Sequence, residues 1–169
     1  MNEQDFKSAY NNSKEQFSTA TFIHLSTFIK YIFPFGNYIA PIIIWTYNKE
    51  KPFVDEHGRQ AINFQLSMFI YTFIIGLACI PLMIYFAADF GSIIDQLEGS
   101  SSDLSFSSIR NISIFAWIFG VFLLLLIAQF FFELYAVINA SIHASRGELY
   151  QYPLSISFIK TLSHKNQYK

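Results

Sequence analysis

The chain has 169 residues and a formal net charge of -1, with 53% hydrophobic and only 14% charged residues. A soluble domain averages about 25% charged residues, so this composition has too few charges to cover a soluble fold of this length. The absence of a basic stripe argues against nucleic acid as a partner. Cys79 is the only cysteine, which excludes an intramolecular disulfide and a zinc-binding cysteine cluster. We therefore expect an integral membrane protein without a cofactor.

The N-terminal region divides into a polar part and an interrupted apolar part. Residues 1–20 are polar and lack the apolar core of a secretory signal, so the following apolar segment is expected to be an uncleaved anchor. That segment contains Pro34 and Pro41, and proline removes a backbone donor and disfavours helix at the residue before it. The pattern predicts two short helices, 21–33 and 38–48. They form either one kinked span or a hairpin.

The positions of the basic residues favour the hairpin. Lysine and arginine collect on the cytoplasmic side of short membrane loops. Residues 49–59 and 146–169 carry most of the bases, whereas the acidic, serine-rich connection 89–110 has only Arg110. A hairpin leaves this one base outside among the eleven in the chain, and a kinked span adds Lys7 and Lys14. We expect both termini in the cytoplasm and loop 89–110 outside.

Two long apolar segments follow the first region. Residues 60–88 and 111–132 carry no formal charge, and each exceeds the roughly 20 residues that a membrane-spanning helix needs. They predict long transmembrane helices over 53–88 and 110–146, and with the hairpin they predict an all-α, polytopic membrane bundle. The predicted organisation is a polar cytoplasmic segment (1–20), a membrane helical domain (21–162) and a polar tail (163–169).

The sequence "DEHGR" opens the first long helix and has two interpretations. Asp55, His57 and Arg59 resemble the ingredients of an active site. However, Pro52 suits the first turn of a helix, acids are favoured near its N-terminus, and Asp55 and Arg59 lie one turn apart. We interpret the cluster primarily as the entry of a helix at the cytoplasmic surface.

A polar stripe continues from this entry into the apolar segment. Its members are spaced by four, three, four and four residues, which places them on one helix face. Exposing a polar stripe of this length to lipid costs free energy, so the stripe must face other helices, a water-filled cavity or a partner. Two interpretations of the stripe remain possible. It is either a hydrogen-bonded seam between helices, or the lining of a solvated path or substrate groove. The stripe comprises Glu56, Gln60, Asn63, Ser67 and Tyr71.

The last long helix carries an acid and a small-residue face. Gln129 and Glu133 lie one turn apart, and an intramembrane carboxylate is either functional or paired, here with Lys30 or His24. Both alternatives remain open. A flat face that allows another helix to approach closely is formed by Ala136, Ala140 and Ala144.

No catalytic motif is present. The sequence "DEHGR" lacks the two histidines, one helical turn apart, of a zinc protease, and the four histidines show no metal-ligand spacing. No serine lies in a nucleophile-elbow context. We therefore expect a protein that is not an enzyme and has no metal site.

Three stretches together carry a family resemblance: "HLSTFIKYIFPFGNYIAPIIIW" (24–45), "KPFVDEHGRQAINFQLS" (51–67) and "ASRGELYQYPLSISFIK" (144–160). They resemble a bacterial family of small membrane proteins of unknown function, which is similar to the twenty-kilodalton membrane subunit of the chloroplast inner-envelope protein import translocon. The resemblance implies a helical bundle with four hydrophobic segments, no known catalytic residue or cofactor, and a part in a protein-conducting or assembly machine.

Together these observations predict a non-enzymatic bundle in the bacterial cytoplasmic (inner) membrane. Its expected partners are membrane lipid and other membrane proteins or itself. The alternative is a small channel or transporter that uses the polar stripe and Glu133.

Overall fold

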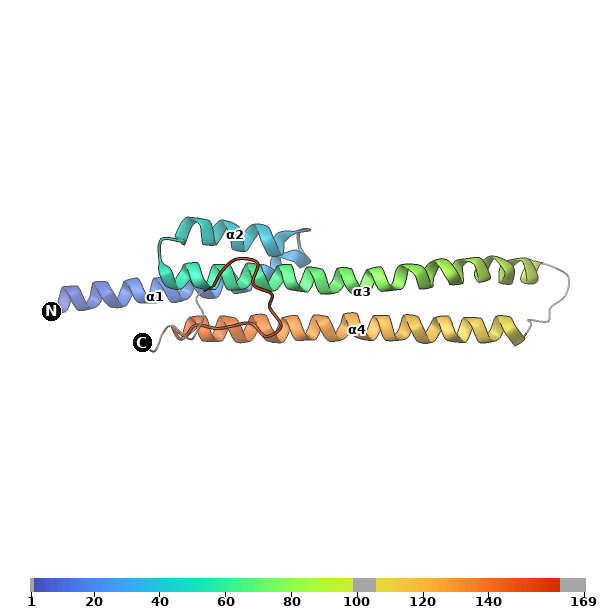
Figure 1. Cartoon of the computed structure of the whole chain (residues 1–169). Coiled ribbons are helices and arrows are strands. Elements are labelled where there is room, and N and C mark those ends of the chain that lie inside the picture. The colour runs from blue at the N-terminus through green and yellow to red at the C-terminus, as the bar shows by residue number, and fades with distance from the viewer. Residues whose placement is uncertain (1, 99–105, 162–169) are drawn as a thin grey trace. The chain divides into compact units, whose positions relative to one another are not determined.

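The computed structural model describes residues 2–98 and 106–161, and every regular element in these ranges is helical (Figure 1). This confirms the all-α class. Two segments are long and apolar enough to cross a membrane, Pro52–Pro81 and Ser113–Ser145. In chain order the helices are α1 (Glu3–Ser26), the 3-10 helix η1 (Thr27–Tyr31), α2 (Gly36–Asn48), α3 (Pro52–Glu98) and α4 (Phe106–Ser145).

The first apolar region forms a helical hairpin whose first arm is longer than predicted. α1 begins at Glu3 rather than at residue 21, because Asn2 and Asp5 form a capping box that starts the helix within the polar segment. The chain reverses at Phe35, which has φ 63°. At the start of α2, a Cβ on Gly36 would lie only 2.7 Å from the side chain of Ile29. α2 then packs against α1 and η1.

The two long helices extend further toward each other than the sequence indicated. α3 continues to Glu98 instead of ending at 88, and α4 begins at Phe106 instead of 110. Helix therefore occupies both ends of the predicted loop 89–110. The middle of that loop (99–105) and the polar tail (163–169) lie outside the described residues.

The chain divides into two compact units. The first unit comprises Met1–Phe69 and Phe132–Lys169, and the second comprises Ile70–Phe131. In the first unit, Ile23, Val54 and Ala61 form a buried core against which Ile44 and Trp45 pack. The second unit is built from the adjoining parts of α3 and α4, and most of its described apolar side chains are exposed.

The chain leaves α4 through a left-handed turn. Gly147 has φ 77°, and a Cβ there would lie 2.5 Å from the ring of Phe17, so both backbone geometry and space favour glycine. Residues 148–161 then contain no helix. We call residues 150–161 the strap, because hydrogen bonds fasten them to α1 and α3 in the first unit.

Candidate functional site

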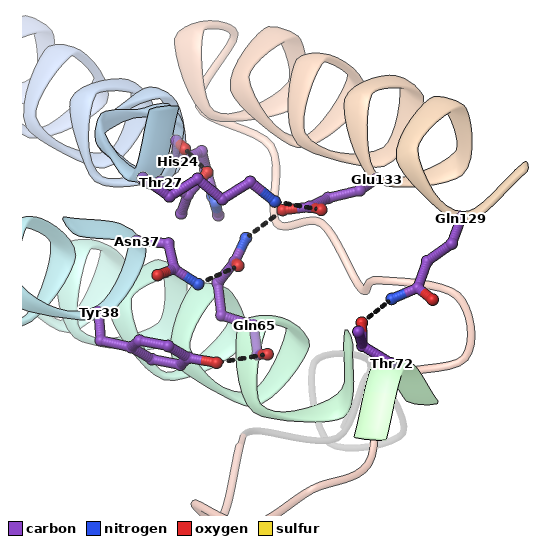
Figure 2. A network of polar contacts seen from close by, with 9 residues as sticks. His24, Thr27, Asn37, Tyr38, Gln65, Thr72, Gln129 and Glu133 are labelled. Carbon is purple, nitrogen blue, oxygen red and sulfur yellow. Dashed lines mark hydrogen bonds and ion pairs between the residues drawn. The ribbon is translucent and has the colours of Figure 1, made fainter. Parts of the chain in front are cut away.

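A carboxylate from α4 lies at the centre of a buried polar network in the first unit. Glu133 is 5% exposed. One of its oxygens forms an ion pair with Lys30 of η1. The other accepts a hydrogen bond of 3.2 Å from Nε2 of Gln65 on α3 (Figure 2). Three elements therefore meet at this carboxylate. The cation and the amide compensate the loss of hydration that burial imposes on the charge.

The network continues from α3 into α2. The side-chain oxygen of Gln65 accepts from Nδ2 of Asn37 at 2.8 Å, and its backbone carbonyl accepts from the hydroxyl of Tyr38 at 3.1 Å (Figure 2). Gln65 thus links the hairpin to Glu133. Lys30 is one of the two partners that the sequence predicted for the acid. Gln65 was not predicted, because it lies in the charge-free run 60–88 but off the helix face of the polar stripe.

Gln129 lies outside this network although the sequence placed it beside Glu133. Its Nε2 donates to Oγ1 of Thr72 at 2.6 Å, a contact within the second unit. One helical turn along α4 therefore separates two side chains with different partners.

Two members of the polar stripe on α3, Asn63 and Ser67, contact the strap. Nε2 of Gln60 donates to Glu56 at 3.0 Å. Further along, Asn63 exchanges two hydrogen bonds with the backbone of Ile159, and Oγ of Ser67 accepts from the backbone N–H of Ile156 at 2.8 Å. These stripe residues are at most 5% exposed. The remaining member, Tyr71, belongs to the second unit and is half-buried.

The helix-entry cluster separates into two parts. Asp55 accepts from Nε of Arg59 at 2.9 Å and from Nε1 of Trp45 at 2.8 Å, which fixes the start of α3 against α2. Arg59 also donates to the strap, at the backbone carbonyl of Lys160. His57 is fully buried and turns toward α1 instead.

His57 belongs to a chain of three buried rings that sequence analysis missed. Its Nδ1 lies 2.8 Å from Nε2 of His24, and Nδ1 of His24 lies 2.9 Å from the hydroxyl of Tyr152 in the strap. Phe64 stacks on Tyr152 with ring centroids 4.1 Å apart. Burial raises the pKa of the Tyr152 hydroxyl well above its ordinary value, so this group stays protonated and available as a donor.

The small residues on α4 pack inside the first unit. Ala136, Ala140 and Ala144 are all fully buried. Oγ1 of Thr21 on α1 lies 3.5 Å from the backbone carbonyl of Ser141, so the two helices approach closely near this face. This is the geometry that small side chains permit.

The polar groups described above bond to one another and hold the elements of the first unit together. Among the described residues there is no group of three or more His, Cys, Asp or Glu side chains that could hold a metal ion. Buried amides, hydroxyls, rings and one ion pair join α1, η1, α2, α3, α4 and the strap. Together with two segments that are long and apolar enough to cross a membrane, this chemistry indicates a small helical membrane protein.

The family of this protein is shown by its sequence. Residues 15–159 match the model of MamF/MmsF, the magnetosome magnetite crystal formation protein family, and the chain belongs to this family. No curated protein and no solved structure matches the chain. The match supports the expectation of a small bacterial membrane protein. It shows no link to the chloroplast translocon subunit that the resemblance included.

Proposed function

We propose that this protein is a non-enzymatic component of a bacterial membrane that acts by associating with other membrane proteins or with itself. Membrane lipid surrounds the protein in this role. Neither a cofactor nor nucleic acid is required for it. The description of its family, magnetosome magnetite crystal formation, supports a role in organising a membrane at which magnetite crystals form.

The observation that carries this proposal is that the polar groups of the bundle are used to hold the bundle together. A conduction path needs polar groups that can exchange partners with water or solute. Here Glu133 is held by Lys30 and Gln65, and Asn63 and Ser67 are held by the strap. Fixed partners favour a structural bundle over a channel.

The exposed surface supports association within the membrane. Trp117 is 77% exposed and Leu124 is 66% exposed on α4, and a Cβ on Gly120 would meet nothing within 4 Å. Apolar side chains beside a small residue allow another transmembrane helix to approach closely. This surface therefore suits lipid and a second helix.

The charge distribution supports a topology with both termini in the cytoplasm and the α3–α4 connection on the opposite side. A cysteine at position 10 in a Cys79→Ser background tests it with an impermeant thiol reagent on intact cells. We expect no labelling until the membrane is permeabilised. Labelling of intact cells would contradict this topology.

Association is tested by photo-crosslinking of the full chain in native membranes. A benzophenone amino acid at the exposed position 124 should give a discrete protein–protein product. The same probe at the buried position 137 should give none, because Val137 is 0% exposed. Products with lipid alone at position 124 would contradict association. Solute flux in liposomes that is lost in Glu133→Gln would favour the channel instead.

A further inference from the structure

After α4 ends, the strap doubles back into the bundle. The hydroxyl of Tyr150 accepts from Nδ2 of Asn139 at 3.3 Å, so the chain first runs back along the last two turns of α4. Tyr152 then stacks on Phe64 of α3 with ring centroids 4.1 Å apart. The chain therefore moves away from the end of α4 at which it began.

The strap next turns and returns toward the start of α3. The backbone N–H of Ile156 donates to Ser67 at 2.8 Å, and the carbonyl of Lys160 accepts from Arg59 at 3.1 Å. Between these two contacts the strap moves back by about 12 Å along the axis of α3. Residues 150–160 thus form a loop that enters and leaves on the same side of the bundle.

The helical hairpin marks the depth of this stretch of α3. Asn37 at the start of α2 bonds to Gln65, and Trp45 near its end bonds to Asp55. The outward side chains of α2 between these points are apolar, with exposed fractions of 45%, 42% and 51% for Ile39, Ile42 and Ile43. Because a contiguous apolar surface is covered by lipid or by another protein in a membrane, hydrocarbon reaches the part of α3 beside it.

The strap lies at the same depth on α3. Its contacts fall between Arg59 and Ser67, within the apolar segment Pro52–Pro81. Residues 149–159 carry no formal charge. An uncharged run about half as long as a transmembrane helix is typical of re-entrant or interfacial segments. Position and composition therefore both favour a location in the hydrocarbon of one leaflet.

A non-helical segment at this depth needs partners for its backbone, because lipid supplies none. The polar stripe of α3 supplies them. Ser67 accepts from the N–H of Ile156, and the amide of Asn63 accepts from the N–H of Ile159 at 2.8 Å and donates to its carbonyl at 2.7 Å. The N–H of Phe158 donates to the carbonyl of Ile156 at 3.1 Å. These bonds replace the water that an ordinary loop binds.

The outer side of the strap is apolar. Ile156 is 41% and Phe158 is 47% exposed, although the backbone beside them is bonded inward. Contact of these side chains with water costs free energy, and contact with acyl chains does not. Lys160 is exposed at the end of the loop that lies beside Arg59, where a long cationic side chain suits the headgroup layer.

From these contacts we propose that residues 150–160 form a re-entrant loop whose outer side contacts the acyl chains of one membrane leaflet. Asn63 and Ser67 hold its backbone, and lipid covers Ile156 and Phe158. This inference rests on the membrane location in the proposed function. It adds a lipid-contact surface on the segment that follows the last transmembrane helix, and it gives the polar stripe the role of keeping that segment in the membrane.

The test measures fluorescence quenching of the full chain in phosphatidylcholine vesicles. Single cysteines in a Cys79→Ser background carry a bimane label. Ile156→Cys and Phe158→Cys should be quenched at least about twofold by lipids brominated in the acyl chains and little by aqueous iodide, because they lie in hydrocarbon. Lys160→Cys should show the reverse, since its backbone lies about 12 Å nearer to the start of α3.

Two further positions serve as controls. Ile42→Cys is the matched control, because Ile42 is 42% exposed on α2 beside the same stretch of α3. Leu123→Cys on α4, where Leu123 is 47% exposed, reports the membrane location of the protein itself. Both should be quenched by the brominated lipid.

The outcomes separate the loop from the proposed function. Quenching by brominated lipid at position 123 but not at 156 and 158 would overturn the re-entrant loop and leave the proposed function standing. The absence of this quenching at every position would overturn both. Shielding of positions 156 and 158 from both quenchers would show that protein rather than lipid covers the loop, and would also overturn the inference.

The role of the stripe is tested by Asn63→Ala in the Phe158→Cys protein. Removing the amide leaves the N–H and carbonyl of Ile159 without partners in lipid, so quenching by brominated lipid should fall about twofold and quenching by iodide should rise. Asn37→Ala, which removes an amide that bonds to Gln65 instead, should change neither. Unchanged quenching in Asn63→Ala would overturn the role of the stripe, and the label positions in the protein with Asn63 intact test the loop independently of this variant.

Discussion

The two units of the chain use the same kinds of helix for different purposes. In the first unit, the polar and charged groups Glu133, Gln65 and Asn63 are at most 5% exposed, and each has a partner on another element. In the second unit, described side chains such as Ile74 and Leu77 are more than half exposed. One unit is held by directional contacts, and the other offers an apolar surface.

This difference indicates where the fold is specified. Apolar side chains that face lipid contribute little to the choice of one helix arrangement. An apolar side chain has a similar free energy against a lipid tail and against another apolar side chain. Buried hydrogen bonds tolerate few alternatives, because an unpaired polar group is costly. The first unit should therefore be sensitive to single substitutions, and the second should tolerate them.

The largest effect is expected for Glu133→Leu. It leaves Lys30 without its carboxylate and Gln65 without an acceptor, and breaking such a pair costs about 3 kcal/mol of unfolding free energy, given that Lys30 is 24% exposed. Reversible unfolding in mixed micelles measures this. The double variant Lys30→Met/Glu133→Leu should recover most of the loss, and Leu124→Ala in the second unit should change stability little. A neutral Glu133→Leu would contradict the role of the network.

An intermediate effect is expected for a pair of matched glycine substitutions on α3. A Cβ on Gly58 would lie 2.3 Å from Cδ1 of Trp45, whereas a Cβ on Gly76 meets nothing within 4 Å. Gly58→Ala should cost about 1–3 kcal/mol through overpacking. Gly76→Ala should be neutral or stabilise by up to about 1 kcal/mol through helix propensity. Equal thermal stabilities of the two variants would remove the contrast between the units at these positions.

The smallest effect is expected for single hydrogen bonds. Tyr152→Phe keeps the stacking on Phe64 and removes the buried bond to His24, which should cost about 1–2 kcal/mol because the histidine nitrogen is left buried without its partner. Thr72→Val removes the exposed bond to Gln129 in the second unit and should cost about 0.5 kcal/mol. Urea titration of both variants compares them, and a larger loss for Thr72→Val would reverse the expected order.

Much of the fold could be predicted from the chain because its signals are local. Long charge-free runs indicate the two long helices, and prolines around residues 34–41 indicate a break. The start of α1 was missed because a capping box and helix-compatible polar residues leave no apolar pattern. The ends at Glu98 and Phe106 differ from the predicted ones because the serines, acids and glycine near the connection are typical of loops.

The site could be predicted only where its contacts are local or constrained by charge. Asp55 and Arg59 pair one turn apart on α3, as their spacing indicated, and Lys30 was one of two cations available to Glu133. The contacts of Tyr152 with His24 and of Ile159 with Asn63 join residues 128 and 96 positions apart. Periodicity carries no information about such pairs.

By itself, the sequence determined the helical class, the apolar segments that suit a membrane, and a polar stripe that must find partners. Those properties follow from the spacing and hydration cost of each side chain along one helix. Only the tertiary structure decided that Gln65 links the hairpin to Glu133, that His57 turns inward to His24, and that the strap covers Asn63 and Ser67. Those choices depend on which elements meet, because a buried polar group is stable only where another segment supplies its hydrogen-bond partner.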